Sequence, residues 1–225
     1  MELVNYSEKS PFNETDTEER TLEDLNRLRA GRFITCYFFH QHKIYTGYED
    51  GLICVWDHQG SVLEPLLGHT KRINCFESIN KFLIVTGSND LTIRKWNTLQ
   101  NTCLTIIKFD EPVSNSIFES STNLLHVCTW DKYIRAVDMQ THKVKNAFMC
   151  SKETVRCIHL AGMFLFVAGS DPIIRRFDTL NAEKENQKLY NGHKGWVNAI
   201  VSRDNLLFSA GDDHRIILWN IESGR

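Results

Sequence analysis

The stretch from Thr86 to Asn97 reads TGSNDLTIRKWN, and the stretch from Ser209 to Asn220 reads SAGDDHRIILWN. The two align without a gap, and in both an aspartate is followed six residues later by a tryptophan. The aspartate recurs at separations of 40, 41, 40 and 42 residues, as Asp50, Asp90, Asp131, Asp171 and Asp213. A period of about 40 residues is typical of proteins built from stacked repeats. We therefore predict five repeats.

Two further positions keep this register in every repeat. Three residues after the aspartate stands an isoleucine: Ile53, Ile93, Ile134, Ile174 or Ile216. Six residues after it stands a large apolar residue: Trp56, Trp96, Val137, Phe177 or Trp219. Short β-branched and aromatic runs, in the second repeat residues 73–77, 82–86, 91–96 and 102–107, predict four strands per repeat. Four short strands in about 40 residues are typical of a β-propeller blade.

Gly68-His69 and Gly192-His193 precede the two quoted stretches, and with them the chain resembles the WD-repeat family. The resemblance implies a hydrogen-bonded chain of side chains inside a blade. It would comprise His69, Thr86, Asp90 and Trp96 in the second repeat and His193, Ser209, Asp213 and Trp219 in the fifth. Such a network is chemically reasonable, because a buried carboxylate needs donors and imidazole and hydroxyl groups supply them. These residues are expected to be structural.

The expected fold class is all-β, a WD-repeat β-propeller with five recognisable blades. The expected domains are a polar, acidic N-terminal segment, 1–31, and a propeller, 32–225, with repeats at approximately 32–70, 71–111, 112–153, 154–194 and 195–225. Residues 22–30 fit either a short helix or a closing strand, and residues 181–187 fit a surface loop. Five repeats favour an incomplete propeller, a fragment of a seven-bladed one; a five-bladed ring is the alternative.

The resemblance weakens in three repeats. Ala30 stands where the first repeat would have its histidine, and the third and fourth repeats have neither Gly-His nor the aligned tryptophan. We expect these blades to lack the full polar chain and to depend more on apolar packing. Two other side-chain sets have alternative interpretations. Cys36, His40 and His42 are either metal ligands or structural residues, and Arg94, Arg135 and Arg175 either bind an acidic ligand or pack within their blades.

Composition limits the classes of function. The 225 residues include 42% hydrophobic residues and carry a formal net charge of −2, so nucleic acid is not the expected partner. No apolar run is long enough to cross a membrane, and we expect no membrane partner. The seven cysteines lack CxxC spacing, which predicts neither a disulfide framework nor a zinc site. No catalytic motif and no cofactor motif is present. We expect an intracellular protein, cytoplasmic or nuclear.

The candidate partner-binding residues occupy the positions just before each repeated aspartate and just before each first strand. Aromatic and arginine side chains on an exposed rim are typical of interaction hot spots, although a tryptophan there can instead pack against neighbouring loops. The candidate rim consists of Phe33, Glu49, Arg72, Trp130, Thr154 and Trp196.

We therefore expect a non-enzymatic scaffold or adaptor that binds other proteins in a complex. A substrate-recruiting subunit of a ubiquitin ligase is one alternative within this class. An RNA-binding component of an RNA-processing complex, or an enzyme with a site in the axial funnel, are alternatives from other classes.

Overall fold

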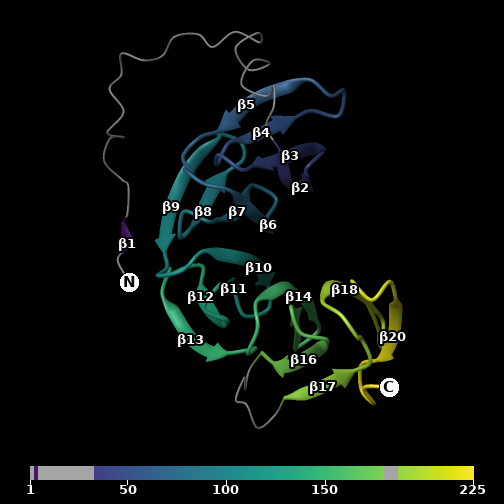
Figure 1. Ribbon diagram of the computed structural model, residues 1–225. Coiled ribbons are helices and arrows are strands. Elements are labelled where there is room, and N and C mark those ends of the chain that lie inside the picture. The colour runs from purple at the N-terminus through teal and green to yellow at the C-terminus, as the bar shows by residue number, and fades with distance from the viewer. Residues whose placement is uncertain (1–2, 5–32, 180–186) are drawn as a thin grey trace, which may run out of the picture. The chain divides into compact units, whose positions relative to one another are not determined.

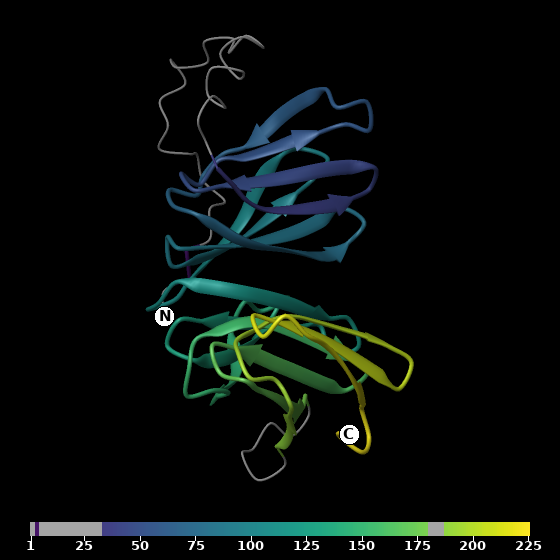
Figure 2. The same cartoon turned by 45° about the vertical axis from the view of Figure 1, so that its right-hand side comes forward.

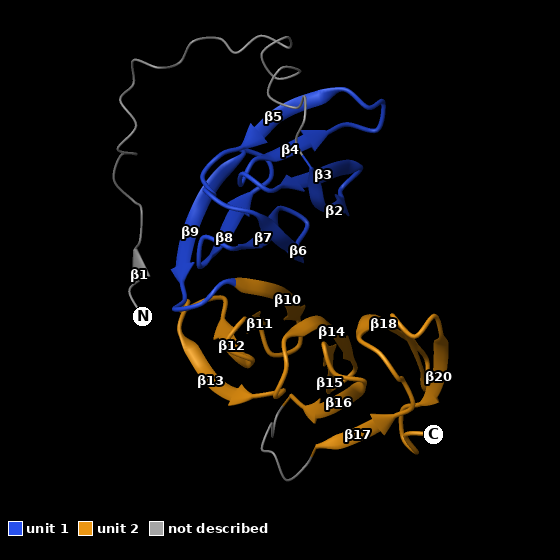
Figure 3. Cartoon of the chain, in the orientation of Figure 1, with its two compact units in different colours: residues 1–112 blue, residues 113–225 orange. Residues whose placement is uncertain are grey.

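The computed structural model describes residues 3–4, 33–179 and 187–225. Within these ranges all regular secondary structure is β-strand, arranged as five antiparallel sheets that we number in chain order (Figure 1). The chain divides into two compact units, residues 1–112 and 113–225 (Figure 3). The first two sheets belong to unit 1 and the other three to unit 2.

Unit 1 contains the first and second sheets, in which consecutive strands lie side by side. The first sheet consists of β2 (Ile34–His40), β3 (Lys43–Tyr48), β4 (Ile53–Trp56) and β5 (Val62–Leu66). The second consists of β6 (Ile73–Asn80), β7 (Leu83–Ser88), β8 (Thr92–Asn97) and β9 (Thr102–Lys108). The four strands predicted for the second repeat are therefore present, each within a few residues of its predicted bounds.

Unit 2 contains three sheets, coloured from teal to yellow in Figure 2, and consecutive strands again lie side by side in each. The third consists of β10 (Val113–Glu119), β11 (Leu124–Thr129), β12 (Tyr133–Asp138) and β13 (Val144–Met149). The fourth consists of β14 (Val155–Ala161), β15 (Phe164–Gly169), β16 (Ile173–Asp178) and β17 (Lys188–Asn191). The fifth consists of β18 (Val197–Arg203), β19 (Leu206–Gly211) and β20 (Ile216–Asn220).

The second sheet has an additional strand that the sequence did not indicate. β1 (Leu3–Val4) pairs antiparallel with β9, with Leu3 opposite Ile107 and Val4 opposite Ile106. β9 would otherwise be an edge strand with unpaired backbone groups, and such an edge readily accepts a further strand. The predicted helix or closing strand at 22–30 lies outside the described residues, as does almost all of the predicted loop at 181–187.

Within each unit the sheets stack face to face, because one sheet alone cannot bury both of its faces. The first strands are neighbours: β2 lies beside β6 in unit 1, and β14 lies beside both β10 and β18 in unit 2. The core between the first and second sheets includes Tyr45, Ile53, Ile84 and Trp96. The cores of unit 2 are formed in the same way from the apolar positions of successive sheets.

A β-bulge follows the first residue of the first strand in all five sheets. The register shifts lie at Ile34/Cys36, Ile73/Cys75, Val113/Asn115, Val155/Cys157 and Val197/Ala199. A bulge leaves one residue out of the ladder and redirects its side chain. The bulged residues are Thr35, Asn74, Ser114, Arg156 and Asn198, so five side chains have equivalent positions at the start of their sheets.

Candidate functional site

The repeated aspartate closes the turn between the second and third strand of every sheet. Its Oδ1 accepts a hydrogen bond from the backbone N–H two residues later, at N–O distances of 3.0–3.2 Å. The donors are Leu52, Thr92, Tyr133, Ile173 and Arg215. Aspartate favours such turns because its short side chain can replace a backbone acceptor. The recurrence in the sequence therefore marks one local structure made five times.

In the second sheet, the remaining oxygen of this aspartate begins a chain of side-chain hydrogen bonds. His69 Nδ1 lies 2.6 Å from Asp90 Oδ2, and His69 Nε2 lies 2.7 Å from Thr86 Oγ1. Trp96 Nε1 donates to the same hydroxyl at 2.8 Å. The structure thus brings together the four residues that the resemblance implied for this repeat.

The donors and acceptors assign the histidine tautomer in this chain. Indole N–H can only donate, so the Thr86 hydroxyl accepts from Trp96, and because the Asp90 carboxylate can only accept from Nδ1, a neutral ring leaves Nε2 to accept the hydrogen of Thr86. Nδ1 then carries the histidine proton and donates it to Asp90. Burial is the largest influence on the pKa of His69, and the pKa is lowered despite the hydrogen bond to Asp90, which agrees with a neutral ring. Burial alone would raise the pKa of Asp90, but hydrogen bonds led by that from His69 lower it to about 2.

The fifth sheet has the same chain. His193 lies 2.9 Å from Asp213 and 2.7 Å from Ser209 Oγ, and Trp219 Nε1 donates to Ser209 at 2.8 Å. A hydrogen bond from the Lys194 backbone N–H, together with that from His193, lowers the pKa of Asp213 to about 2. A Cβ on Gly192 would lie 2.6 Å from Trp219 Cη2, so the glycine before the histidine is needed for the indole to pack.

In the first sheet the end of this chain is present. Trp56 Nε1 donates to Thr46 Oγ1 at 2.8 Å, the bond that its aligned residues make in the second sheet. Ala30, which replaces the histidine in this repeat, lies outside the described residues.

In the third and fourth sheets an arginine binds the repeated aspartate. Arg175 Nη1 and Nη2 lie 3.0 and 2.6 Å from the two oxygens of Asp171. Arg135 pairs with both oxygens of Asp131 in the same way. Two parallel N–H donors to one carboxylate make a strong and directional contact. The arginine thus provides the donors that histidine provides in the second and fifth sheets.

The positions that complete the polar chain in the second and fifth sheets hold apolar residues in these two sheets. Val127 and Val167 occupy the hydroxyl position, and Val137 and Phe177 occupy the tryptophan position; all four are buried. The apolar packing expected for these repeats is present, but the sequence reasoning missed the ion pair that accompanies it. Because Arg135 and Arg175 bind their own aspartates, their guanidinium groups do not form the arc for an acidic ligand that was one of their two interpretations.

Two of the possible metal ligands named from the sequence, Cys36 and His40, instead form hydrogen bonds to backbone carbonyls of unit 1. Cys36 Sγ donates to the carbonyl of Ile73, and His40 Nε2 lies 3.1 Å from the carbonyl of Lys81. Among the described residues, no group of three or more His, Cys, Asp or Glu side chains could hold a metal ion. All seven cysteines are described and all are free thiols. In the described ranges no helix is long and apolar enough to cross a membrane.

A buried carboxylate that the sequence did not single out joins the third sheet to the fourth. Glu119 accepts hydrogen bonds from Thr122 at 2.7 Å and from Thr179 at 2.9 Å, and His126 Nε2 lies 3.1 Å away. Burial would raise the pKa of Glu119, but these hydrogen bonds together lower it. Its contacts resemble those of the repeated aspartates, with a carboxylate held by hydroxyl and imidazole groups.

The two kinds of candidate rim position, before the repeated aspartate and before the first strand, are neighbours in three sheets. The backbone N–H before the aspartate donates to the carbonyl before the first strand, from Asn89 to Arg72, from Ser170 to Thr154 and from Asp212 to Trp196, at 2.8–2.9 Å. In unit 1, Phe33 is 73% exposed and Arg72 lies 3.6 Å from Glu49. In unit 2, Thr154 is exposed, and Trp130 and Trp196 are about half exposed.

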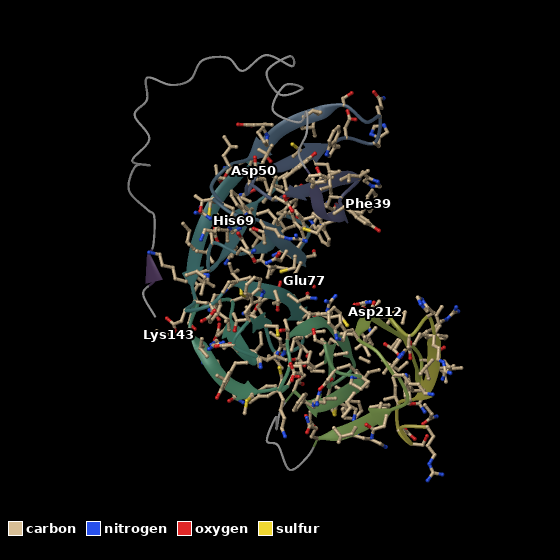
Figure 4. The ribbon with its side chains drawn as sticks, in the orientation of Figure 1. Phe39, Asp50, His69, Glu77, Lys143 and Asp212 are labelled. Atoms are coloured by element: carbon tan, nitrogen blue, oxygen red, sulfur yellow. The ribbon has the colours of Figure 1, made fainter. Side chains whose placement is uncertain are left out.

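The clearest surface feature surrounds Trp196 in unit 2. The guanidinium of Arg156 lies 4.2 Å from the centre of the Trp196 ring. Arg156 donates to Asn198 Oδ1 at 3.1 Å and to Ser170 Oγ at 3.4 Å, and Asn198 donates to Asp212, which Figure 4 labels. We call these five residues, Arg156, Ser170, Trp196, Asn198 and Asp212, the Arg156 surface. The sequence reasoning named Trp196 but missed Arg156 and Asn198, which the repeated bulge places beside it.

Comparisons with known proteins agree with this fold. The family described as "WD domain, G-beta repeat" matches residues 60–97 and 184–220. The ribosome biogenesis protein WDR12 homolog of Nematostella vectensis is 24% identical over 238 residues, covering 98% of this chain and 50% of that protein. Pre-mRNA-processing factor 19 of Bos taurus is 27% identical over 169 residues, covering 71% of this chain and 33% of that protein.

Among solved structures, the computationally designed Ika8 protein matches with a TM-score of 0.73 and 22% identity, covering 85% of this chain and 59% of that one. At this identity the match shows the fold alone. The repeats, the sheets and the comparisons define an all-β fold of the propeller class. The chain has the fold of a WD-repeat β-propeller, with two segments that match the WD-repeat family model, and it spans half or less of the length of the two relatives named above.

The hydrogen-bonded chain of the second sheet predicts a large effect for Asp90→Ala. The substitution leaves the His69 Nδ1–H and the Thr92 N–H without their acceptor, and we expect the free energy of unfolding to fall by about 1–3 kcal/mol. Urea unfolding followed by circular dichroism measures the change. The control is Asp110→Ala, an exposed aspartate of the same unit, which should change stability by less than about 0.5 kcal/mol. Equal effects of the two substitutions would contradict a structural role for Asp90.

The pKa of His69 predicts that acid weakens the fold. Its pKa is lowered in the folded chain, so below about pH 6.5 the unfolded chain binds a proton that the folded chain does not. Stability should therefore decrease from pH 7 to pH 5.5, by at most about 1.4 kcal/mol per pH unit from this residue. His69→Asn should flatten the dependence measured by urea unfolding. The Asp90 contribution is complete above about pH 4 and is lost as the pH falls toward 2. An unchanged slope in the variant would show that His69 is not held neutral.

The ion pair of the fourth sheet predicts energetic coupling between its two residues. Arg175→Met removes the donors but keeps an apolar stem, and it should lower the free energy of unfolding by about 1–3 kcal/mol. In an Asp171→Asn background, which keeps the turn acceptor for Ile173, the same substitution should cost much less. Urea unfolding of the four proteins gives the coupling energy. Equal costs in both backgrounds would mean that the contact does not stabilise the sheet.

Proposed function

We propose that the chain is a non-enzymatic interaction scaffold that binds other proteins within a complex, and that the Arg156 surface is a binding site of unit 2. The site is formed by rigid elements, because its residues lie at a strand bulge, at a first-strand entry and in a turn between paired strands. It presents an aromatic ring and a cation for recognition and brings together no set of acid, base and nucleophile.

One observation carries the proposal: the guanidinium of Arg156 stacks on an indole that is 46% exposed. Its side-chain hydrogen-bond partners, Asn198 and Ser170, are neutral, and no carboxylate of the described residues forms an ion pair with it. Tryptophan and arginine are the residues most enriched at interaction hot spots. A partner with an acidic group beside an apolar or aromatic side chain would match this pair in charge and shape.

The relatives favour a role within an assembly. One is named for ribosome biogenesis and one for pre-mRNA processing, and both are longer than this chain. By analogy we propose an intracellular complex, cytoplasmic or nuclear, with an RNA-processing assembly favoured over a ubiquitin ligase. A formal net charge of −2 favours protein over RNA as the direct partner.

Trp196→Ala and Arg156→Ala should each reduce partner capture at least tenfold while leaving thermal unfolding nearly unchanged, because both side chains are exposed. Affinity capture from a cell lysate with quantitative mass spectrometry, using the full 225-residue chain as bait, measures the effect. The matched control is Met163→Ala, which removes a side chain of similar exposure at the opposite end of β14. It should recover the same partners as the unmodified chain.

Identical partner lists for all three variants would contradict the assignment of this surface. Partners that survive nuclease treatment support direct protein binding. Partners that are lost on nuclease treatment would point instead to RNA as the bridge.

A further inference from the structure

The fourth strands of the sheets differ in how well their edges are protected against further pairing. Edge strands commonly carry charged residues or proline, which discourage an additional strand. The protecting residues are Glu64 and Pro65 in β5, Lys145 in β13 and Lys188 in β17. β9, with the sequence TCLTIIK, has neither a charged residue nor a proline before its last residue. Its edge is therefore the least protected of these four.

The edge of β9 already holds a strand, but a short one. β1 pairs with Ile106 and Ile107 (Figure 1). The ladder between β8 and β9 runs without a break from Thr105 to Lys108, so the regular part of the edge is four residues long. In the described part of the chain, the outer sides of Thr105 and Lys108 have no partner strand. A strand of two residues is held by few ladder hydrogen bonds, so a longer strand can replace it.

A bulge marks one end of this regular edge. The register between β8 and β9 shifts between Lys95 and Trp96, which leaves Leu104 out of the ladder. A bulge bends its strand, so a strand bound beside Thr105 would leave the edge at this point. Leu104 is 39% exposed and provides an apolar side chain there. The edge thus suits a short extended segment.

The side chains along the edge define what a bound strand must carry. Ile106 is partly exposed, Ile107 is buried and Lys108 is exposed. Directly opposed side chains of neighbouring strands interact, so apolar residues are the favourable neighbours of Ile106 and Ile107. β1 has valine and leucine at these two positions. Continued by one residue, the same register places the residue that precedes this apolar pair opposite Lys108, where a carboxylate is favoured.

We propose that the outer edge of β9 is a peptide-binding site, at which an extended segment of a partner protein adds an antiparallel strand to the second sheet. The segment has an acidic residue followed by two leucine or β-branched residues. Backbone hydrogen bonds provide the affinity in this mode of recognition, and the side chains beside the edge provide the selectivity. Leu3–Val4 occupies the site in the free chain and is displaced when the partner binds. The site lies in unit 1, so the inference is independent of the Arg156 surface in unit 2.

Competition with Leu3–Val4 provides the first test. The probe is a fluorescent peptide with the sequence of residues 1–8, MELVNYSE, which has a glutamate before the apolar pair. Leu3→Pro with Val4→Pro in the full 225-residue chain removes the backbone donors of β1. Fluorescence anisotropy should show that this double variant binds the probe at least about tenfold more tightly than the unmodified chain, because a tethered competitor has been removed. No binding to the double variant, or equal binding to both proteins, would overturn the proposal.

A charge exchange tests the register of the bound strand. In the double variant, Lys108→Glu should weaken binding of the probe about fivefold, and a second peptide with lysine in place of the glutamate that precedes the apolar pair should recover the loss. The controls are Lys143→Glu, at an exposed lysine beside β13 (Figure 4), and Arg156→Ala; both should leave binding unchanged. A second peptide that fails to recover binding contradicts the assigned edge, as does a loss of binding with Arg156→Ala, which would place the peptide on the Arg156 surface.

Discussion

The hydrogen bond that an aspartate side chain accepts from the backbone N–H two residues later is the interaction on which each sheet depends. It fixes the turn between the second and third strand, and that turn sets the register of the hairpin. With the register fixed, the isoleucine three residues after the aspartate lies on one face of the sheet. The large apolar residue six positions after the aspartate lies on the other face. In three turns the residue after the aspartate, Leu91, Lys132 or His214, has a φ of +59° to +71°. The side-chain acceptor helps to hold a conformation that such residues rarely adopt.

A buried carboxylate in this position needs donors, and the chain supplies them in two ways. The second and fifth sheets use a neutral histidine connected through a hydroxyl to an indole. The third and fourth use an arginine, and the residues that would have continued the chain become valine and phenylalanine. The changes occur together, since a hydroxyl without its imidazole and indole would be a buried and poorly satisfied group. Loss of the recognisable motif in these repeats is therefore an exchange of one satisfied network for another.

Much of this could be predicted from the sequence. The spacing of the aspartates gave the number of repeats, the strands of the second repeat were placed within a few residues, and the resemblance implied the chain that includes His69 and Trp96. Arg135 and Arg175 each lie four residues after their aspartates, but their ion pairs were missed. The absence of the histidine and the tryptophan in these repeats led to the prediction of apolar packing alone. Arg156 was missed because a bulge does not show in an alternating pattern. The pairing of Leu3–Val4 with β9 depends on an unpaired strand edge, which the pattern of the N-terminal segment does not indicate.

The aspartate turn is the local unit of this propeller, and native-state hydrogen exchange tests its role most directly. The amides to follow are those two residues after each aspartate, in Leu52, Thr92, Tyr133, Ile173 and Arg215. All five should exchange far more slowly than amides of exposed loops, although they lie in turns. If they exchange as fast as unstructured peptide amides while the neighbouring strands remain protected, the aspartate does not hold the turn and the explanation of the repeat fails.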